Sequence, residues 1–86
     1  MNIDDLREEI DKCNIELINI LKKRQIIAKQ IGIIKKAKNI KTYDPLREKV
    51  IINKMKSFSD ENLSEEMIEN IFKEILLASK ILQNSL

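Results

Sequence analysis

The chain is nearly free of helix-breaking residues, since its 86 positions include one glycine and one proline. Both residue types mark turns, so a chain with so few of them reverses direction only a few times. Its apolar residues, mostly Ile and Leu, recur at steps of three and four, which is typical of amphipathic helices and not of strands. We therefore predict an all-α fold of a few long helices, built as a single domain over residues 1–86.

Capping signals divide the chain into helices at about residues 4–37, 45–56 and 64–84. Acidic residues suit the start of the first helix, and Asn39 is its expected end. Asp44 and Pro45 suit the N-cap and first position of the second helix, and Ser64 can cap the third. The residues expected to face inward on the last two helices are Leu46, Ile51, Ile52, Met55, Ile68, Ile71, Phe72, Ile75, Leu76 and Leu82.

The first helix is too long for a compact monomer. About 33 helical residues span roughly 50 Å, whereas a compact domain of this length is only about 30 Å across. Its protruding half, which we expect to carry Ile27, Ile31 and Ile34, needs cover for its apolar face. A second copy packed antiparallel gives that cover under two-fold symmetry. We predict a three-helix protomer with one long N-terminal helix, assembled as an intertwined antiparallel homodimer.

Two cations interrupt the apolar face of the first helix. Arg24 and Lys35 are eleven residues apart, which makes three turns with about 20° of drift and places them on one face roughly 16 Å apart. A small anion can sit between them. Arg7 lies on another face, about 25 Å from Arg24. In an antiparallel dimer with its axis near Ile18, however, Arg7 of the partner chain reaches the level of this site.

Polar side chains also lie on the apolar faces of the other two helices. Glu48 is on the inward face of the second helix, where a carboxylate is costly unless it is paired. Ser79 and Gln83 are four residues apart on the apolar face of the third helix. Each of these residues also has an ordinary explanation, as a helix-dipole partner, an interhelical hydrogen bond or a solvated charge. Their joint placement favours one shared, water-poor pocket.

Composition excludes several classes of function. The chain has no His, and its single Cys13, which we expect to be buried on the apolar face, cannot build a zinc cluster, so we predict no metal. A net charge of +2 and few aromatic residues argue against a nucleic-acid binder. The N-terminus has no signal-peptide pattern, and no apolar run reaches the ~18 residues that span a membrane. We therefore predict a cytoplasmic protein that does not bind membranes.

Five short motifs occur in a fixed order along the chain. They are Leu6-Arg7-Glu8-Glu9-Ile10-Asp11, Arg24, Gly32-Ile33-Ile34-Lys35, Asp44-Pro45-Leu46-Arg47-Glu48 and Ser79-Lys80-Ile81-Leu82-Gln83. Together they resemble the AroQ-type, all-helical chorismate mutases. The resemblance implies a three-helix protomer that dimerises through its first helix. It also implies cofactor-free conversion of chorismate, a dicarboxylate, to prephenate in phenylalanine and tyrosine biosynthesis.

The resemblance implies residue roles as well. Arg7 of the partner chain and Arg24 would bind substrate carboxylates, and Ser79 would touch the ring carboxylate. Lys35 would contact a carboxylate and the ether oxygen, to which Gln83 would also donate.

The start of the second helix is implied to hold the region of the ring hydroxyl. Asp44 and Glu48 would contact that region, with Arg47 beside them. Tyr43 stands where one branch of the family has a basic residue, which implies a less cationic pocket rim. The residues expected to be catalytic are Lys35, Gln83, Arg24 and Glu48.

Two other functions fit the same helices. An isochorismate-pyruvate lyase of this fold needs the same cations, but we expect it to lack the acidic residue at Glu48. A non-catalytic dimerisation or regulatory module would show no turnover of chorismate. The mutase is the function that the motifs favour most.

Overall fold

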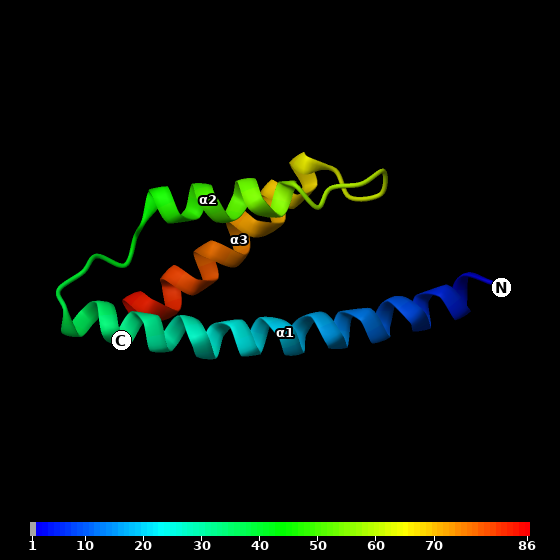
Figure 1. Ribbon diagram of the computed structural model, residues 1–86. Helices are drawn as coiled ribbons and strands as arrows, with labels where there is room; N and C mark the ends of the chain where they lie inside the picture. Colours follow the sequence, from blue (N-terminus) through cyan, green and yellow to red (C-terminus); the bar gives the residue numbers. More distant parts are fainter. Residues whose placement is uncertain (1) are drawn as a thin grey trace.

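The computed structural model describes residues 2–86 and is all-helical, as predicted (Figure 1). Its helices are α1 (Ile3–Ala37), α2 (Pro45–Lys56) and α3 (Glu65–Asn84). The first helix starts one residue earlier than predicted, because Asn2 is its N-cap. The Asn2 side chain accepts a hydrogen bond from the Asp5 amide at 2.9 Å, and the Asp5 side chain in turn accepts from the Asn2 amide. This reciprocal capping box satisfies amides that have no partner within the helix.

Asn39, the predicted stop, adopts the left-handed helical conformation just after the end of α1. Asn39 has a φ of 55°, and asparagine tolerates this conformation better than most residues. The Asn39 amide donates to the carbonyl oxygen of Lys36, and the Ile40 amide donates to that of Lys35 at 2.8 Å. This double closure is a Schellman motif, and it turns the chain sharply towards α2.

The other two helices begin at the predicted caps. The Asp44 side chain accepts from the Arg47 amide at 3.0 Å, with Pro45 at the first helical position, and the Ser64 hydroxyl accepts from the Met67 amide at 3.2 Å. The connection between α2 and α3 is closed by Asp60, whose carboxylate accepts from the amides of residues 62 and 63.

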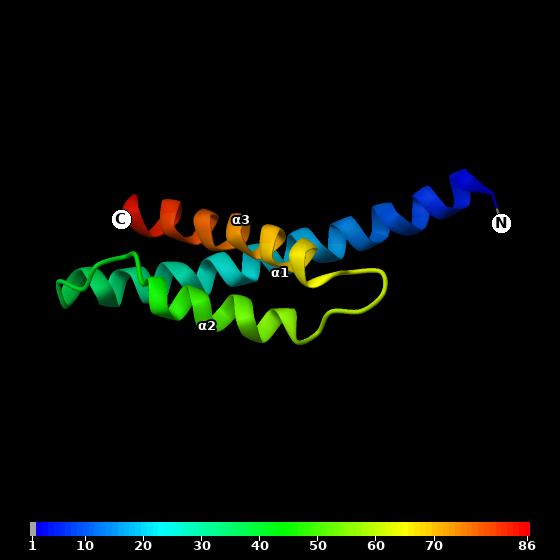
Figure 2. The same ribbon diagram turned by 90° about the horizontal axis from the view of Figure 1, so that it is seen from above.

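The helix α3 packs against both α1 and α2, whereas α1 and α2 have no direct backbone contact within residues 2–86 (Figure 1). The last turns of α3 run alongside the C-terminal half of α1. The N-terminal half of α1 extends beyond the other helices, so the protomer measures 55 × 23 × 14 Å (Figure 2).

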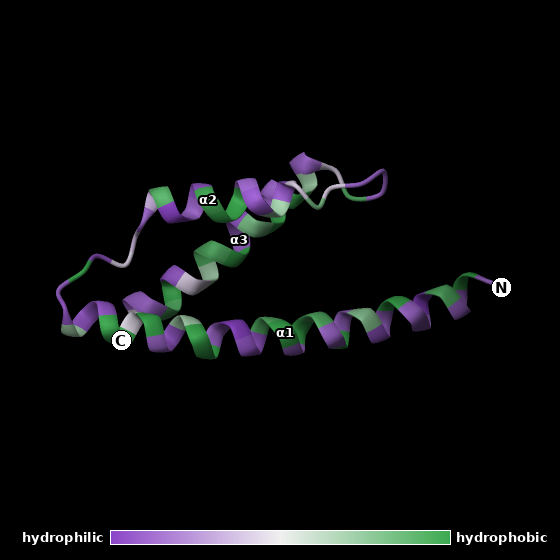
Figure 3. Cartoon of the chain, in the orientation of Figure 1, coloured by the Kyte–Doolittle hydropathy of each residue, from purple (hydrophilic) through white to green (hydrophobic). Residues whose placement is uncertain are grey.

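The protruding half of α1 is therefore not the half that was predicted. It is the N-terminal half, with every residue from Ile3 to Ile20 exposed, whereas Ile27 and Ile31 lie on the half that faces α3. Hydrophobic residues still alternate with polar ones along the exposed half (Figure 3). Cys13, expected to be buried, is exposed in the protomer for the same reason.

The core is small and lies where α3 meets its neighbours. Its buried residues are Ala28, Gly32, Ile68, Leu76 and Ser79. On α2 the prediction was correct for residues 51, 52 and 55, which are half-buried, but wrong for Leu46, which is 77% exposed. Nine residues separate Leu46 from Met55, which is about half a turn off in phase, so the two point to opposite faces. Ile71, at the edge of the inward face of α3, is also exposed.

An ion-pair cluster joins the end of α2 to α3. The Glu69 carboxylate lies 2.6 Å from Lys56 Nζ and 3.3 Å from Lys73 Nζ. The hydrogen bond from Lys56 is the main reason that the pKa of Glu69 is lowered, with a smaller contribution from Lys73. Because the pKa is lowered by folding, Glu69 in the unfolded chain becomes protonated at a higher pH than Glu69 in the folded chain.

We therefore expect Glu69→Gln to lower the Tm at pH 7 by a small, measurable amount. The stabilising contribution of Glu69 is present above the ordinary carboxyl pKa of 4.5 and is lost as the pH falls through the lowered folded value. The Tm difference between wild type and variant should thus shrink towards zero as the pH falls below 4.5. Glu61→Gln, which removes an exposed carboxylate with no ion pair within residues 2–86, is the control. A Tm difference that does not change with pH would contradict this account.

Within residues 2–86, none of the helices combines the length and the apolar character that crossing a membrane requires.

Candidate active site

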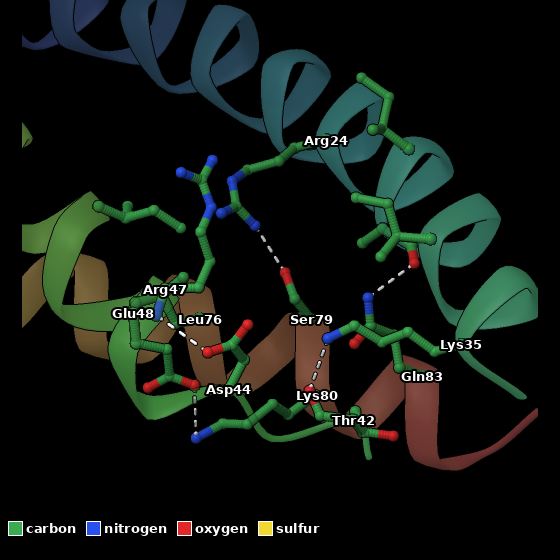
Figure 4. A pocket seen from close by; sticks show the side chains of 14 residues that line it. Arg24, Lys35, Thr42, Asp44, Arg47, Glu48, Leu76, Ser79, Lys80 and Gln83 are labelled. Carbon is green, nitrogen blue, oxygen red and sulfur yellow. Dashed lines mark hydrogen bonds and ion pairs between the residues drawn. The ribbon is translucent and has the colours of Figure 1, made fainter. Parts of the chain in front are cut away.

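A cavity of about 260 Å³ lies between the three helices (Figure 4). Its walls are both apolar and charged. The residues that line it are Arg24, Ile27, Ala28, Ile31, Lys35, Thr42, Asp44, Arg47, Glu48, Ile51, Leu76, Ser79, Lys80 and Gln83. Seven of the eight residues predicted for the site are among them. Four cations and two carboxylates leave the wall with a net charge of +2, which favours a dianionic ligand.

Two arginines on opposite walls face the same space. Arg24 of α1 and Arg47 of α2 extend towards each other across one end of the cavity (Figure 4). Arg24 is oriented by a hydrogen bond from Nη1 to Ser79 Oγ on α3, at 2.6 Å. Like charges that converge in this way repel each other unless an anion lies between them. A guanidinium group can bind a carboxylate with two parallel hydrogen bonds.

Lys35 is held at the opposite end of the cavity by the turn that ends α1. Its backbone carbonyl accepts from Ile40, and its Nζ donates to the carbonyl oxygen of Thr42 at 3.0 Å. The side chain is half-buried, and an ammonium group has three N–H donors. One donor is used by Thr42, so two remain to face a ligand in the cavity.

Gln83 and Ser79 bring α3 against α1 along the cavity wall. Gln83 Nε2 donates to the carbonyl oxygen of Ala28 at 2.8 Å. That bond fixes which end of the amide faces the cavity, and the second N–H of the same nitrogen stays available for a ligand oxygen. Ser79 is buried, and its hydroxyl accepts from Arg24 and also lies within hydrogen-bond distance of Gln25 Oε1 at 3.3 Å.

Gly32 permits this close approach of the two helices. A Cβ at position 32 would lie 2.9 Å from Gln83 Cγ and 2.8 Å from Leu86 Cδ1, well inside van der Waals contact. The single glycine of the chain is therefore placed where the C-terminal end of α3 lies against α1, four residues after the carbonyl that orients Gln83.

The two carboxylates of the cavity have different partners. Asp44 caps α2 through the Arg47 amide. Glu48 forms an ion pair with Lys80 Nζ of α3 at 3.1 Å, and both side chains are about one-quarter exposed. Lys80 was not predicted as a site residue. It flanks Ser79 and lies one helical turn before Gln83, but only the packing of α2 on α3 reveals its carboxylate partner.

Arg7 is not part of the cavity in a single chain. It lies on the exposed half of α1, with a side chain that is 69% exposed and whose Nη1 is 3.8 Å from the Asp4 carboxylate. The protomer therefore brings together the predicted residues of α1, α2 and α3 except this one. Within residues 2–86 there is no group of three or more His, Cys, Asp or Glu side chains that could hold a metal ion.

The sequence of the chain matches one known protein family over nearly its whole length. The family model described as chorismate mutase type II matches residues 6–84. The chain belongs to the chorismate mutase type II family. The matched range includes all of the cavity-lining residues and nearly all of the three helices.

Solved chorismate mutases share the fold closely. The form II structure from Thermus thermophilus has a TM-score of 0.91 and 30% identity, covering 95% of this chain and 93% of that one. A chorismate mutase from Helicobacter pylori in complex with prephenate has a TM-score of 0.88 and 30% identity, covering 96% of this chain and 90% of that one. These similarities extend over the whole three-helix protomer of the family.

A curated relative is a longer protein. The bifunctional chorismate mutase/prephenate dehydratase of Aquifex aeolicus (strain VF5) is 31% identical over 88 residues, which is 98% of this chain. The chain spans about a quarter of that relative's length, 24%. The similarity to the bifunctional protein therefore concerns one chorismate mutase segment of it.

Proposed function

We propose that this chain is a chorismate mutase, a single domain over residues 1–86 that converts chorismate to prephenate for phenylalanine and tyrosine biosynthesis. The observation that carries the proposal is the convergence of cations from three helices, with the amide of Gln83, on one cavity of net positive charge. Membership of the family and similarity to a chorismate mutase in complex with prephenate support the same conclusion.

The proposed reaction suits a site without His or a reactive Cys. It is a unimolecular Claisen rearrangement, in which one C–O bond breaks as one C–C bond forms. No proton moves and no covalent intermediate is needed, so positioning and electrostatic stabilisation can supply the rate acceleration. The protein's task is then to hold a flexible dianion in its reactive conformer and to stabilise charge on the ether oxygen.

Each side chain has a task in that scheme. Arg24, oriented by Ser79, and Arg47 bind carboxylate groups at one end of the cavity. Lys35 and the free N–H of Gln83 donate to the ether oxygen as its negative charge grows, which stabilises the transition state more than the ground state. Glu48 accepts a hydrogen bond from the ring hydroxyl, with Asp44 near it.

The same proposal includes an antiparallel homodimer. The radius of gyration is 15.9 Å, whereas a compact domain of this length has about 12 Å. The protomer exposes 7233 Å², roughly 1,900 Å² more than a compact monomer of its size. If two protomers each covered that excess they would bury about 3,800 Å², which is within the range of obligate homodimers.

The homodimer would also complete the site. Exposed apolar residues along α1 give the partner's helix a surface to cover. They include Leu6, Ile10, Leu17 and Ile20. With α1 antiparallel to its partner, Arg7 of the partner chain enters the cavity as a further carboxylate ligand.

The direct test is the loss of chorismate absorbance with purified protein, measured together with the molar mass in solution. We expect turnover by a dimer. A well-folded dimer without turnover would refute the mutase and favour a non-catalytic module, and turnover of isochorismate in place of chorismate would favour the lyase.

Gly32 gives a prediction about how the site is held. We expect Gly32→Ala to lower kcat about tenfold, because the added Cβ pushes Gln83 away from Ala28. The Tm should be unchanged or lower, since the gain in helix propensity of about 1 kcal/mol offsets part or at most all of an overpacking cost of about 1–3 kcal/mol.

Steady-state kinetics and thermal unfolding of the same preparations measure both quantities. In a Gln83→Ala background, Gly32→Ala should cost almost no further activity, because the group that it displaces is already gone. An equal loss in both backgrounds would mean that Gly32 acts on the site by another route.

A further inference from the structure

We propose that Lys80 is a positioning residue. Its ammonium group lies over the ring of Tyr43 and orients the Glu48 carboxylate, which accepts a hydrogen bond from the substrate's ring hydroxyl. This inference rests on the proposed function and adds to it a residue outside the predicted site. The fifth motif contains Lys80, but the resemblance gives this residue no role, and a carboxylate-binding cavity does not in itself require a lysine there.

The geometry joins three elements at one corner of the cavity. Lys80 Nζ of α3 lies 3.1 Å from Glu48 Oε2 of α2 (Figure 4). The same Nζ lies 4.6 Å from the ring centroid of Tyr43, in the connection before α2. Both members of the ion pair are only about one-quarter exposed, so water screens the pair less than it would on the surface. The less cationic rim implied at Tyr43 stays a prediction, but Lys80 brings one cation to this ring.

The ring and the carboxylate restrict the ammonium group from two sides. A lysine side chain has many rotamers, and an aromatic face within about 6 Å favours those that place the charge above it. The ion pair occupies Oε2 of Glu48 and leaves Oε1 for another donor. A carboxylate held in this way offers a fixed, charged acceptor to a neutral hydroxyl without further reorganisation.

Two simpler roles make different predictions. If Lys80 only fastened α2 to α3, its loss would lower the Tm and leave the kinetics of the folded protein unchanged. If Lys80 only attracted the dianionic substrate, its loss would raise KM at low salt, whether or not position 48 carried a carboxylate. A positioning role through Glu48 instead makes the effect of Lys80 depend on Glu48.

The test is a double-mutant cycle between Lys80→Met and Glu48→Gln, with kcat and KM measured for each protein. We expect Lys80→Met to lower kcat/KM about tenfold, with part of the loss in kcat, and Lys80→Arg to recover most of it. In the Glu48→Gln background, Lys80→Met should change kcat/KM by less than about twofold. Equal losses in both backgrounds, or a loss confined to KM and abolished by salt, would overturn the proposal.

Lys73→Met is the matched control. Lys73 is on the same helix and also pairs with a glutamate, Glu69, but it lies outside the cavity. This variant should retain the kcat and KM of the wild type. If it lowers kcat/KM as much as Lys80→Met does, a general loss of helix packing explains both results, and the positioning role is refuted.

A second readout does not depend on turnover. Tyr43 is the single tyrosine and the chain has no Trp, so tyrosine emission reports on this ring alone. We expect Lys80→Met, but not Lys73→Met, to change that emission, and unchanged emission would overturn the placement of Lys80. If the wild type fails to convert chorismate, the proposed function is refuted, and the emission still decides whether Lys80 occupies this position.

Discussion

Lys35→Ala is expected to lower kcat by about 10²–10³-fold while the protein stays folded. The loss corresponds to about 2.7–4 kcal/mol, which is typical when one preorganised donor to a developing oxyanion is removed. Lys35 is suited to this role because the turn after α1 fixes its backbone and Thr42 fixes its Nζ, so that the charge is in place before the reaction begins. Single-turnover and steady-state rates on the same preparation measure the effect.

The control for charge is Lys38→Ala, which removes the same charge from an exposed position at the same helix end. It should leave kcat within about twofold of the wild type, because Lys38 does not line the cavity and its exposed charge is screened by solvent. Circular dichroism and Tm confirm that both variants are folded. A Lys35→Ala protein with nearly normal kcat would show that the ether oxygen receives its stabilisation elsewhere.

Mixing Arg7→Ala protein with Arg24→Ala protein is expected to restore activity that neither variant has alone. In the proposed homodimer each cavity takes Arg24 from one chain and Arg7 from the other. A heterodimer of the two variants then contains one cavity with both arginines and one with neither. With random exchange of subunits, about one quarter of all cavities should be intact, so activity should rise to about a quarter of the wild-type value.

Subunit exchange must be demonstrated in the same mixture, for example by mass spectrometry of differently labelled chains. A mixture of Arg24→Ala with Lys35→Ala is the matched control, because both residues line the cavity of their own chain and the heterodimer gains no complete cavity. Exchange without recovery in the first mixture would refute the sharing of cavities. A wild-type protein that is active as a monomer would do the same.

The helices could be predicted because their limits are local. Asp44 with Pro45, Ser64 and Asn39 act on backbone groups within a few residues of themselves, and each cap and stop has the predicted role in the structure. Leu46 was assigned to the wrong face of α2, because a short helix with few apolar residues defines its inward face poorly. The half of α1 that protrudes could not be read from its sequence, because both halves carry apolar residues.

The site was predicted in part for the same physical reason. Arg24 and Lys35 are fixed relative to each other by a single helix, so their common face follows from its periodicity alone. The pairing of Glu48 with Lys80 joins two helices, and no spacing along the chain encodes it. The contact of Gly32 with Gln83 likewise depends on how closely α1 and α3 approach.

The sequence alone determined the three helices, the excess length of the first one and the placement of polar groups on apolar faces, because these properties depend on interactions within one or two helical turns. Tertiary structure decided which half of α1 is covered by α3, which partner each half-buried charge has and how the cavity is closed. Those features depend on packing between helices distant in sequence, where side-chain volume and charge pairing act together.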